Sequence, residues 1–358
     1  MRAWLSTGPS ARRLAGRCST QPRPSNRSTA CIVPHRPRIL RHVAQLLHRH
    51  AITPLRSRVF QMADIAAAQR GIRHDQTEPV RFSYAHDGQS PFRRWLITSI
   101  ERASGSRHLK RLYDDWVAAG AEGNPFDVAM NLLQFRPDLH GTPLPALPRE
   151  GGLLLVANHP FGIADGLALG WLATQLRDQV QILTHSLLCA VPEFRPYLLP
   201  VDFGETPQAR RTSAATRRTA ADLLRSGGAV VIFPGGSVAT SNRPFSRSAA
   251  ELPWHPFVAR LALTPETSVI PIHVHGQNSL GFQLASHVSY PLRIAMLFHE
   301  TRRRIGSDIR MTIGAPMGPS ELEVLPRPDI ATALRSRCLT LGDADPEDTF
   351  HWPRHIRW

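Results

Sequence analysis

Long hydrophobic runs are missing from this chain of 358 residues. A helix that spans a bilayer needs about 20 consecutive apolar residues, and no stretch reaches that length. The longest apolar stretches, Gly152–Ala157 and Ala229–Phe233, have the length of buried strands. We therefore expect no transmembrane helix. If the protein acts on lipid, we expect it to work from the membrane surface.

Paired cysteines are missing as well. The four cysteines form no Cys-x-x-Cys pair: Cys18, Cys31, Cys189 and Cys338. Such a pair is the usual signature of a zinc or redox site, so neither is supported, and a reducing compartment fits best. His273 and His275 point to the same side of an expected strand, but no acidic or cysteine partner is placed to complete a metal site. We expect no metal and no cofactor.

Lysine is almost absent, since Lys110 stands alone beside 42 arginines. The net charge of +15 invites a nucleic-acid-binding interpretation. Its distribution argues against that function, because residues 1–61 hold 12 arginines and no acid, which leaves about +3 for the rest of the chain. No known nucleic-acid motif accompanies this charge. We therefore expect no nucleic-acid partner.

Residues 1–61 look like an extension rather than part of the fold, because they are rich in Arg, Ser and Pro. This composition is similar to that of a transit peptide. A second interpretation, which we favour, is that translation starts at Met62. The remaining chain divides into an expected helical segment over 62–150, a core over 151–342 and a tail over 343–358.

Apolar residues recur at spacings of three and four from Pro91 to about Phe135, which is typical of amphipathic helices. A second helix is expected over Phe126–Phe135, and the three prolines of Gly141–Arg149 indicate a linker. From Gly151 onward, short apolar strands alternate with helices. The expected strands are Gly152–Ala157, Val180–Thr184, Leu198–Val201, Ala229–Phe233, Ser268–Val274 and Arg310–Ile313. The expected helices are Ala164–Leu176, Thr206–Arg225, Trp254–Leu263 and Ile330–Leu341.

This alternation predicts an α/β fold, with a mixed, mostly parallel sheet covered by helices on both faces and a helical segment before it. Ligands of such sheets bind at the carboxyl ends of strands. His159 directly follows the first core strand, within the stretch Asn158-His159-Pro160-Phe161-Gly162-Ile163-Ala164-Asp165-Gly166. A carboxylate at Asp165 can orient an imidazole and raise its basicity, as in the base-and-orienter part of a catalytic triad. Alone, this spacing more often marks a structural hydrogen bond.

No Gly-x-Ser-x-Gly elbow supplies a serine nucleophile, so His159 is expected to deprotonate the substrate itself. A second candidate segment, Phe233-Pro234-Gly235-Gly236-Ser237, follows another strand. Its adjacent glycines allow backbone N–H groups to converge on an anion or an oxyanion, although a plain tight turn is the commoner explanation. Arg243 follows closely and is a candidate phosphate contact.

These two segments and a Val-Ile-Pro strand occur in an order that resembles the glycerolipid acyltransferase superfamily, which includes lysophosphatidic acid acyltransferases. Members carry Asn-His-x4-Asp, then Phe-Pro-Glu-Gly-Thr-Arg-Ser, then a Val-Ile-Pro-type strand. The matching residues here are Asn158-His159 with Asp165, Phe233-Pro234 with Gly236, and Val269-Ile270-Pro271. The resemblance runs from about Pro91 to Leu341.

Two departures from these motifs resemble a particular bacterial branch, the hemolysin-like and ornithine-lipid acyltransferases. Five residues rather than four separate His159 from Asp165, and Gly235 replaces the motif glutamate. A third departure concerns the substrate, because relatives that bind phosphate often carry an arginine where this chain reads Val201-Asp202-Phe203-Gly204. Arg210 or Arg211 could substitute for it.

The resemblance implies an enzyme of membrane lipid biosynthesis that transfers an acyl chain from acyl carrier protein or acyl-coenzyme A to a lysolipid hydroxyl. His159 would be the general base and Asp165 its orienter. The implied substrate-binding residues are Asn158, Phe233, Pro234, Gly235, Gly236, Ser237, Arg243, Arg210 and Arg211. The implied location is cytoplasmic, at the inner face of the cell membrane. The alternative is a catalytically degenerate protein that binds lipid or thioester, which Gly235 favours.

Overall fold

The computed structural model describes residues 105–185, 191–201, 207–246 and 248–352, together with 91, 94, 95 and 97–99. All of them belong to one compact unit, Pro54–Trp358. The expected extension over residues 1–61 lies outside the described residues, and the expected segment boundaries stay predictions. None of the described helices is both long and apolar enough to cross a membrane.

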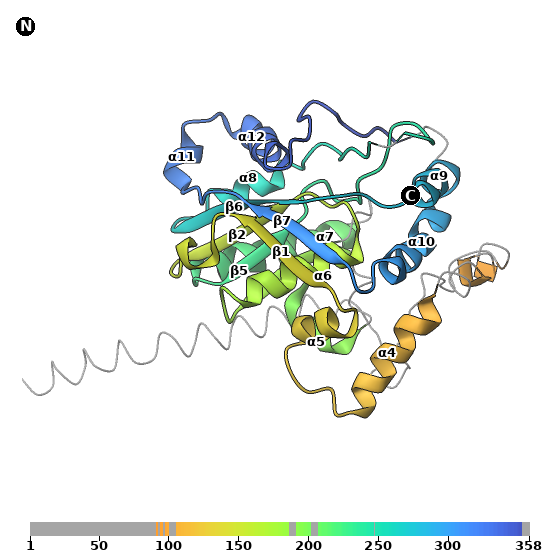
Figure 1. The fold of residues 1–358 in the computed structure, drawn as a ribbon. Coiled ribbons are helices and arrows are strands. Elements are labelled where there is room, and N and C mark those ends of the chain that lie inside the picture. Colours follow the sequence, from red (N-terminus) through yellow and green to blue (C-terminus); the bar gives the residue numbers. More distant parts are fainter. Residues whose placement is uncertain are drawn as a thin grey trace, which may run out of the picture. The chain divides into compact units, whose positions relative to one another are not determined.

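Seven strands form one sheet in the order β1-β7-β6-β2-β5-β3-β4 (Figure 1). Five neighbouring strands, from β6 to β4, run parallel to one another, whereas β7 pairs antiparallel to β6 and parallel to β1. The strands are β1 Arg136–Gly141, β2 Gly152–Ala157, β3 Val180–His185, β4 Leu198–Val201, β5 Ala229–Ile232, β6 Thr267–Val274 and β7 Asp308–Ile313. The sheet is therefore mixed and mostly parallel, as expected.

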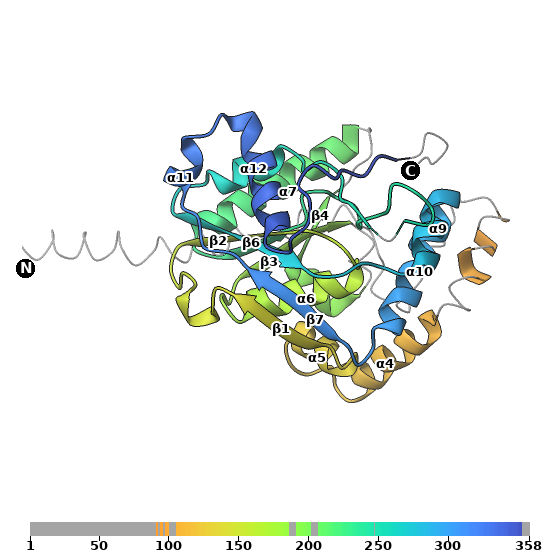
Figure 2. The same ribbon diagram turned by 45° about the horizontal axis from the view of Figure 1, so that its top comes forward.

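Helices cover both faces of the sheet (Figures 1 and 2). Helices α5 and α6 pack against one face, and α7, α8 and α12 against the other. The α-helices are α4 Ser106–Ala118, α5 Pro125–Leu132, α6 Ile163–Thr174, α7 Pro207–Arg225, α8 Phe257–Ala262, α9 Leu280–Val288, α10 Tyr290–Arg303, α11 Pro319–Glu323 and α12 Arg327–Thr340. Within the described residues, 3-10 turns cover Leu144–Ala146 and Pro192–Tyr197.

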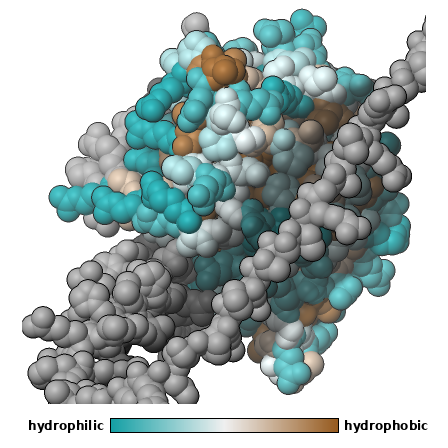
Figure 3. Space-filling model, turned by 90° about the vertical axis from the view of Figure 1, so that its left-hand side faces the viewer, coloured by the Kyte–Doolittle hydropathy of each residue, from teal (hydrophilic) through white to brown (hydrophobic). Residues whose placement is uncertain are grey.

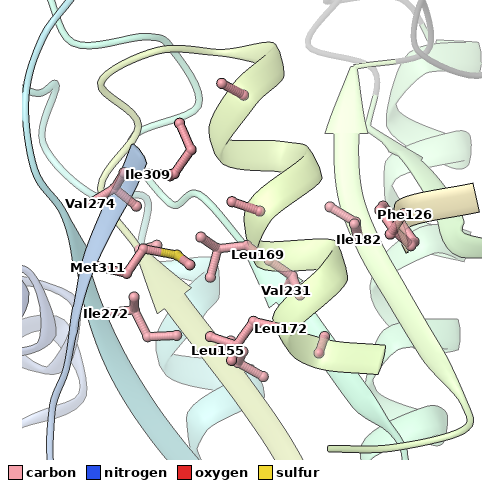
Figure 4. Packing of buried hydrophobic residues seen from close by; sticks show 14 of the residues in the cluster. Phe126, Leu155, Leu169, Leu172, Ile182, Val231, Ile272, Val274, Ile309 and Met311 are labelled. Atoms are coloured by element: carbon pink, nitrogen blue, oxygen red, sulfur yellow. The ribbon is translucent and has the colours of Figure 1, made fainter. Parts of the chain in front are cut away.

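Strand β2 lies at the centre and is buried along its whole length. Leu153 and Leu155 face the α6 side, whereas Leu154 and Val156 face the α7 side. This two-sided burial explains its continuous apolar sequence, because a strand covered on both faces has no solvent-facing positions. In Figure 4, Leu169 and Leu172 of α6 point toward the sheet residues around Leu155.

Close packing of α5 on α6 depends on one glycine. Asn124 caps α5 by accepting a hydrogen bond from Phe126 N, at 2.9 Å. The Phe126 ring is buried and lies against Gly170 of α6, so that a β-carbon there would come within 2.1 Å of the ring. The ring also contacts Phe194 and Tyr197 edge-on. This contact holds α6, and therefore the loop before it, against the sheet.

Several elements differ from those that the sequence predicts. Strand β1 was not predicted: it lies between the expected helix Phe126–Phe135 and the expected linker Gly141–Arg149. Its polar, proline-containing sequence lies at the sheet edge and has no apolar alternation that would indicate a strand. Helices α9 and α10 were not predicted, although α9 begins at a clear cap, where Ser279 Oγ accepts from Phe282 N. Helix α8 starts at Phe257 rather than Trp254, and β7 at Asp308 rather than Arg310.

Substitution of Gly170 by Ala should destabilise the protein by about 1–3 kcal/mol, because the added methyl overlaps the buried Phe126 ring. Gly166 on the same helix is the matched control, since a β-carbon there meets nothing within 4 Å. Its replacement by Ala should be neutral or stabilising by up to about 1 kcal/mol, as alanine is the better helix former. Urea unfolding of both variants measures the difference. Equal effects would contradict the packing described.

Candidate active site

His159 and Asp165 face each other across the loop between β2 and α6. The imidazole Nδ1 lies 2.8 Å from Asp165 Oδ2, and the carboxylate is completely buried. This contact is close but is not aligned as a hydrogen bond. The carboxylate instead accepts hydrogen bonds from the backbone N–H of Phe161 and Gly162, at 2.9 and 3.0 Å from Oδ2. Asp165 thus stabilises the loop and also faces the imidazole.

The loop keeps its shape through a few specific contacts. Gly162 has φ +93°, a left-handed conformation that favours glycine. The Phe161 ring lies against Gly276, where a β-carbon would come within 2.7 Å of it. The guanidinium of Arg304 lies over the Phe161 ring and also donates to Gln277 O at 2.8 Å. The segment over residues 276–279 therefore supports the His159 loop.

Asn158 is buried, and its side chain continues the pairing of β2 with β6. Its Nδ2 donates to Val274 O at 2.9 Å, and its Oδ1 accepts from Val274 N at 2.6 Å. These two hydrogen bonds extend the pairing of the strands beyond Ala157 and Ile272, which form the last backbone pair. The expected substrate contact of Asn158 stays a prediction; the observed contacts fix the end of β2, and so the start of the His159 loop.

The Phe233–Ser237 segment lies beside His159, as the resemblance implies. The Phe233 ring stacks on the imidazole with centroids 4.2 Å apart. Further along the same loop, Ala239 N donates to His159 O at 2.7 Å. Within the loop, Gly236 has φ +66° and its N–H donates to Phe233 O. This N–H is used by the turn, so Gly236 does not present it to an anion.

Glu251, which the sequence analysis did not single out, also contacts His159. Its Oε1 accepts a short hydrogen bond from the backbone N–H of His159, and its Oε2 accepts from Trp254 Nε1 at 2.8 Å. Burial raises the pKa of this carboxyl, and the hydrogen bonds from Trp254 and His159 oppose that rise. A single glutamate between Ala250 and Leu252 carries no motif, so nothing in the sequence pointed to it.

Arg293 holds the other end of the loop, although it lies on α10. Its guanidinium is fully buried between the rings of Phe282 and Trp352. It donates to Ser237 Oγ at 3.0 Å and also to Val238 O. Further hydrogen bonds reach Thr240 and Ser286. Val238, which stands where the family motif has arginine, packs on Phe282 and Leu297.

Of the three arginines expected near the substrate, the two whose side chains the structure describes, Arg211 and Arg243, form no hydrogen bond with His159. The side chain of Arg210 lies outside what the structure describes, whereas Arg211 and Arg243 are exposed. Within the described residues, neither of these two side chains forms an ion pair or hydrogen bond with another candidate site residue. Pro234 is buried in the turn and accepts a hydrogen bond from His255 N.

His273 and His275 are used in packing contacts. His273 Nδ1 lies 3.1 Å from Cys338 O, and His275 Nε2 lies 2.7 Å from Thr312 Oγ1. Burial lowers the pKa of His273 to about 4, so the ring is neutral at pH 7. Among the described residues, no group of three His, Cys, Asp or Glu side chains is arranged to hold a metal ion.

Replacement of Arg293 by Leu should destabilise the protein by about 2–4 kcal/mol, because it leaves several buried oxygens of the loop without donors. Arg303 on the same helix is the control: it is exposed, and its replacement by Leu should cost at most about 1 kcal/mol. Thermal and urea unfolding measure both. Similar losses in the two variants would mean that the loop does not depend on the buried guanidinium.

A comparison with protein families matches the part of the chain that carries these residues. Residues 139–275 match the Acyltransferase family, a span that includes His159, Asp165, the Phe233 loop and Glu251. A lyso-glycine lipid O-acyltransferase of Phocaeicola vulgatus is 25% identical over 202 residues, covering 53% of this chain and 67% of that protein. A protein of the same name from Bacteroides thetaiotaomicron is 25% identical over 198 residues, covering 53% and 69%.

A crystal structure of the 1-acyl-sn-glycerophosphate (LPA) acyltransferase PlsC from Thermotoga maritima is also similar, with 15% identity and a TM-score of 0.39 over 84% of this chain and 95% of that one. The family match over residues 139–275, the two relatives and the order of the motifs around His159 together support an acyltransferase of the glycerolipid acyltransferase superfamily.

Proposed function

We propose that this enzyme transfers a fatty acyl chain from a thioester to the hydroxyl of a lysolipid, with His159 as the general base. The observation that carries the proposal is that three segments of the chain contact His159, at its imidazole or at its backbone. Asp165 faces Nδ1, the Phe233 ring stacks on the imidazole, and Glu251 and Ala239 bind the backbone N–H and C=O of His159. Such convergence on a partly exposed histidine is typical of a reacting base.

The contact with Asp165 supports different roles for the two ring nitrogens. Nδ1 is buried and faces the carboxylate, which leaves Nε2 for the substrate. Nε2 takes the proton of the acceptor hydroxyl while the oxygen attacks the thioester carbonyl. The tetrahedral intermediate then collapses, the carbon–sulfur bond breaks, and the imidazolium returns its proton to the leaving thiolate. Asp165 stabilises the imidazolium that forms in between. The donor is acyl carrier protein or acyl-coenzyme A, and these steps serve either.

The acceptor that we propose has an amino-acid head group rather than a phosphate. Both named relatives are lyso-glycine lipid O-acyltransferases. The loop that carries Glu and Arg in the family motif has Gly235 and Val238 here, and Val238 is buried among apolar side chains. Loss of an arginine removes a bidentate partner for a phosphate. Mass spectrometry of total lipids from cells with and without the gene tests the acceptor: the expected difference is one acyl chain on an amino-acid lipid.

Substitution of His159 by Ala should lower kcat about 100- to 10,000-fold, because the proton of the acceptor hydroxyl loses its base. The assay follows a radiolabelled acyl thioester with lyso-glycine lipid and lysophosphatidic acid as separate acceptors. His351→Ala, an exposed histidine, is the control and should keep full activity. Near-normal turnover in His159→Ala would rule out the mechanism. Lipid binding without turnover in the natural protein would favour the degenerate alternative.

We further propose that the edge formed by α9, α10 and α4 lies on an anionic membrane. These helices lie in a row in Figures 1 and 2. Three aliphatic side chains are exposed at positions i, i+4 and i+8 of α9: Leu280, Leu284 and Val288. The face drawn in Figure 3, at the other end of the sheet, is mostly hydrophilic where it is coloured, with its apolar residues in small separate areas.

Cationic and aromatic side chains flank this stripe. Phe245 is 78% exposed on a loop that α9 holds through Gln283, whose Oε1 accepts from Ser241 N. A pocket between α4 and α10 is lined by four cationic or titratable side chains and one glycine: Arg107, His108, Arg111, Arg302 and Gly105. Aliphatic groups beside arginines fit the boundary between acyl chains and anionic head groups. The protein would thus lie peripherally on the inner face of the cell membrane.

The double variant Leu284→Glu/Val288→Glu should bind anionic vesicles at least about tenfold more weakly, because each apolar side chain gains about 1.5–3 kcal/mol on leaving water. Flotation with phosphatidylglycerol-containing liposomes measures this. Val324→Glu is the control, since Val324 is 80% exposed but lies beyond α11, away from α9. Unchanged flotation of the double variant would exclude α9 as the contact.

A further inference from the structure

We propose that Glu251 takes the place of the glutamate that the acyltransferase motif has lost at Gly235, and that its carboxylate positions His159 for proton transfer. This inference rests on the proposed function. Glu251 is a positioning residue in this account, because it binds the backbone of His159 rather than the substrate.

Gly235 and Glu251 lie close together in the fold. A β-carbon built on Gly235 would lie 3.5 Å from Glu251 Oε2, which is ordinary van der Waals contact. The carboxylate of Glu251 therefore fills the space next to the position where the family motif carries its own glutamate. Gly235 and Glu251 are 16 positions apart in the sequence, yet the structure brings one carboxyl group and one missing side chain together.

Both oxygens of the buried Glu251 carboxylate accept hydrogen bonds. Oε1 accepts from His159 N and Oε2 from Trp254 Nε1, and the side chain is shielded from water. Burying a carboxylate is costly unless donors compensate it, so a glutamate is not expected here as simple filling. One of its two donors is the main chain of the proposed base. The carboxylate therefore fixes the position of the His159 backbone.

The backbone of Glu251 is itself held by α12 and by the segment that follows it. Its backbone C=O accepts from Phe350 N at 2.9 Å, and Glu251 also forms a β-bridge with Thr349. Arg335 of α12 reaches the same carbonyl at 3.5 Å and donates to Asp348 O at 2.8 Å. The segment after α12 is thus tied to Glu251. A firmly held carboxylate can transmit its position to His159, whereas a mobile one could not.

A relocation experiment tests this inference with four variants. Glu251→Ala should lower kcat about 100-fold with little change in KM, because a small displacement of a reacting group costs about that factor. Gly235→Glu alone should also lower activity, since two carboxylates would compete for one space. The double variant Gly235→Glu/Glu251→Ala should recover at least tenfold over Glu251→Ala, because the new side chain enters the vacated space. Glu323→Gln, an exposed glutamate on α11, is the control and should match the natural protein.

The sign of the Gly235→Glu effect is the decisive readout. It should be harmful when Glu251 is present and beneficial when Glu251 is absent, which a general loss of stability does not produce. Circular dichroism and thermal unfolding of each variant establish that it is folded. If Glu251→Ala does not fold, Glu251→Ser, which also vacates the space of the carboxylate, replaces it in both the single and the double variant. Folded variants with normal kcat, or a double variant no better than the single one, would overturn the inference.

Failure of the proposed function would look different. In that case the natural protein and the Glu323→Gln control would transfer no acyl group to either lysolipid. If the natural protein is active and His159→Ala is not, the function stands and only the part assigned to Glu251 is under test.

Discussion

A completely buried carboxylate at Asp165 organises the candidate active site. A buried charge needs hydrogen-bond donors, and here the backbone N–H groups of Phe161 and Gly162 supply them. To bring both groups to one carboxylate, the chain must turn sharply after β2, which is why Gly162 adopts a positive φ. The same turn brings His159 Nδ1 to 2.8 Å from Asp165 Oδ2, the oxygen that also accepts from Phe161 N and Gly162 N. The contacts that shape the loop therefore also give the imidazole its orientation.

The sequence predicted the part of this arrangement that is local. Buried parallel strands such as β2 have continuous apolar sequences, and the residues that follow them stand at the active edge of the sheet, so His159 and Phe233 could be located from pattern alone. The strand β1 could not, because an edge strand of polar residues has no periodic signal. Glu251 and Arg293 could not either, since their importance comes from what they contact across the fold. Local patterns locate the loops of the site but not the distant side chains that hold them.

The Phe233 loop makes this difference concrete. In the family motif the loop has its own glutamate and arginine, whereas here both positions are uncharged, at Gly235 and Val238. The structure places Glu251 next to the first position, and the buried guanidinium of Arg293 donates to the carbonyl of the second. One acidic side chain, Glu251, and one basic side chain, Arg293, therefore still lie against the loop. A motif comparison along the sequence alone describes the loop as having lost both charges, and the loss at Gly235 is what favours the catalytically degenerate alternative.

The burial of these two groups bears on what the enzyme can bind. Arg293 is enclosed between Phe282 and Trp352, and its hydrogen bonds go to the protein, so its charge does not reach a ligand directly. An exposed arginine on this loop would offer a phosphate a bidentate partner, but a buried one only makes the loop rigid. Among the described residues, the Phe233 ring rather than a cationic side chain stacks on the imidazole of His159. This arrangement supports the acceptor that we propose, a head group without a phosphate.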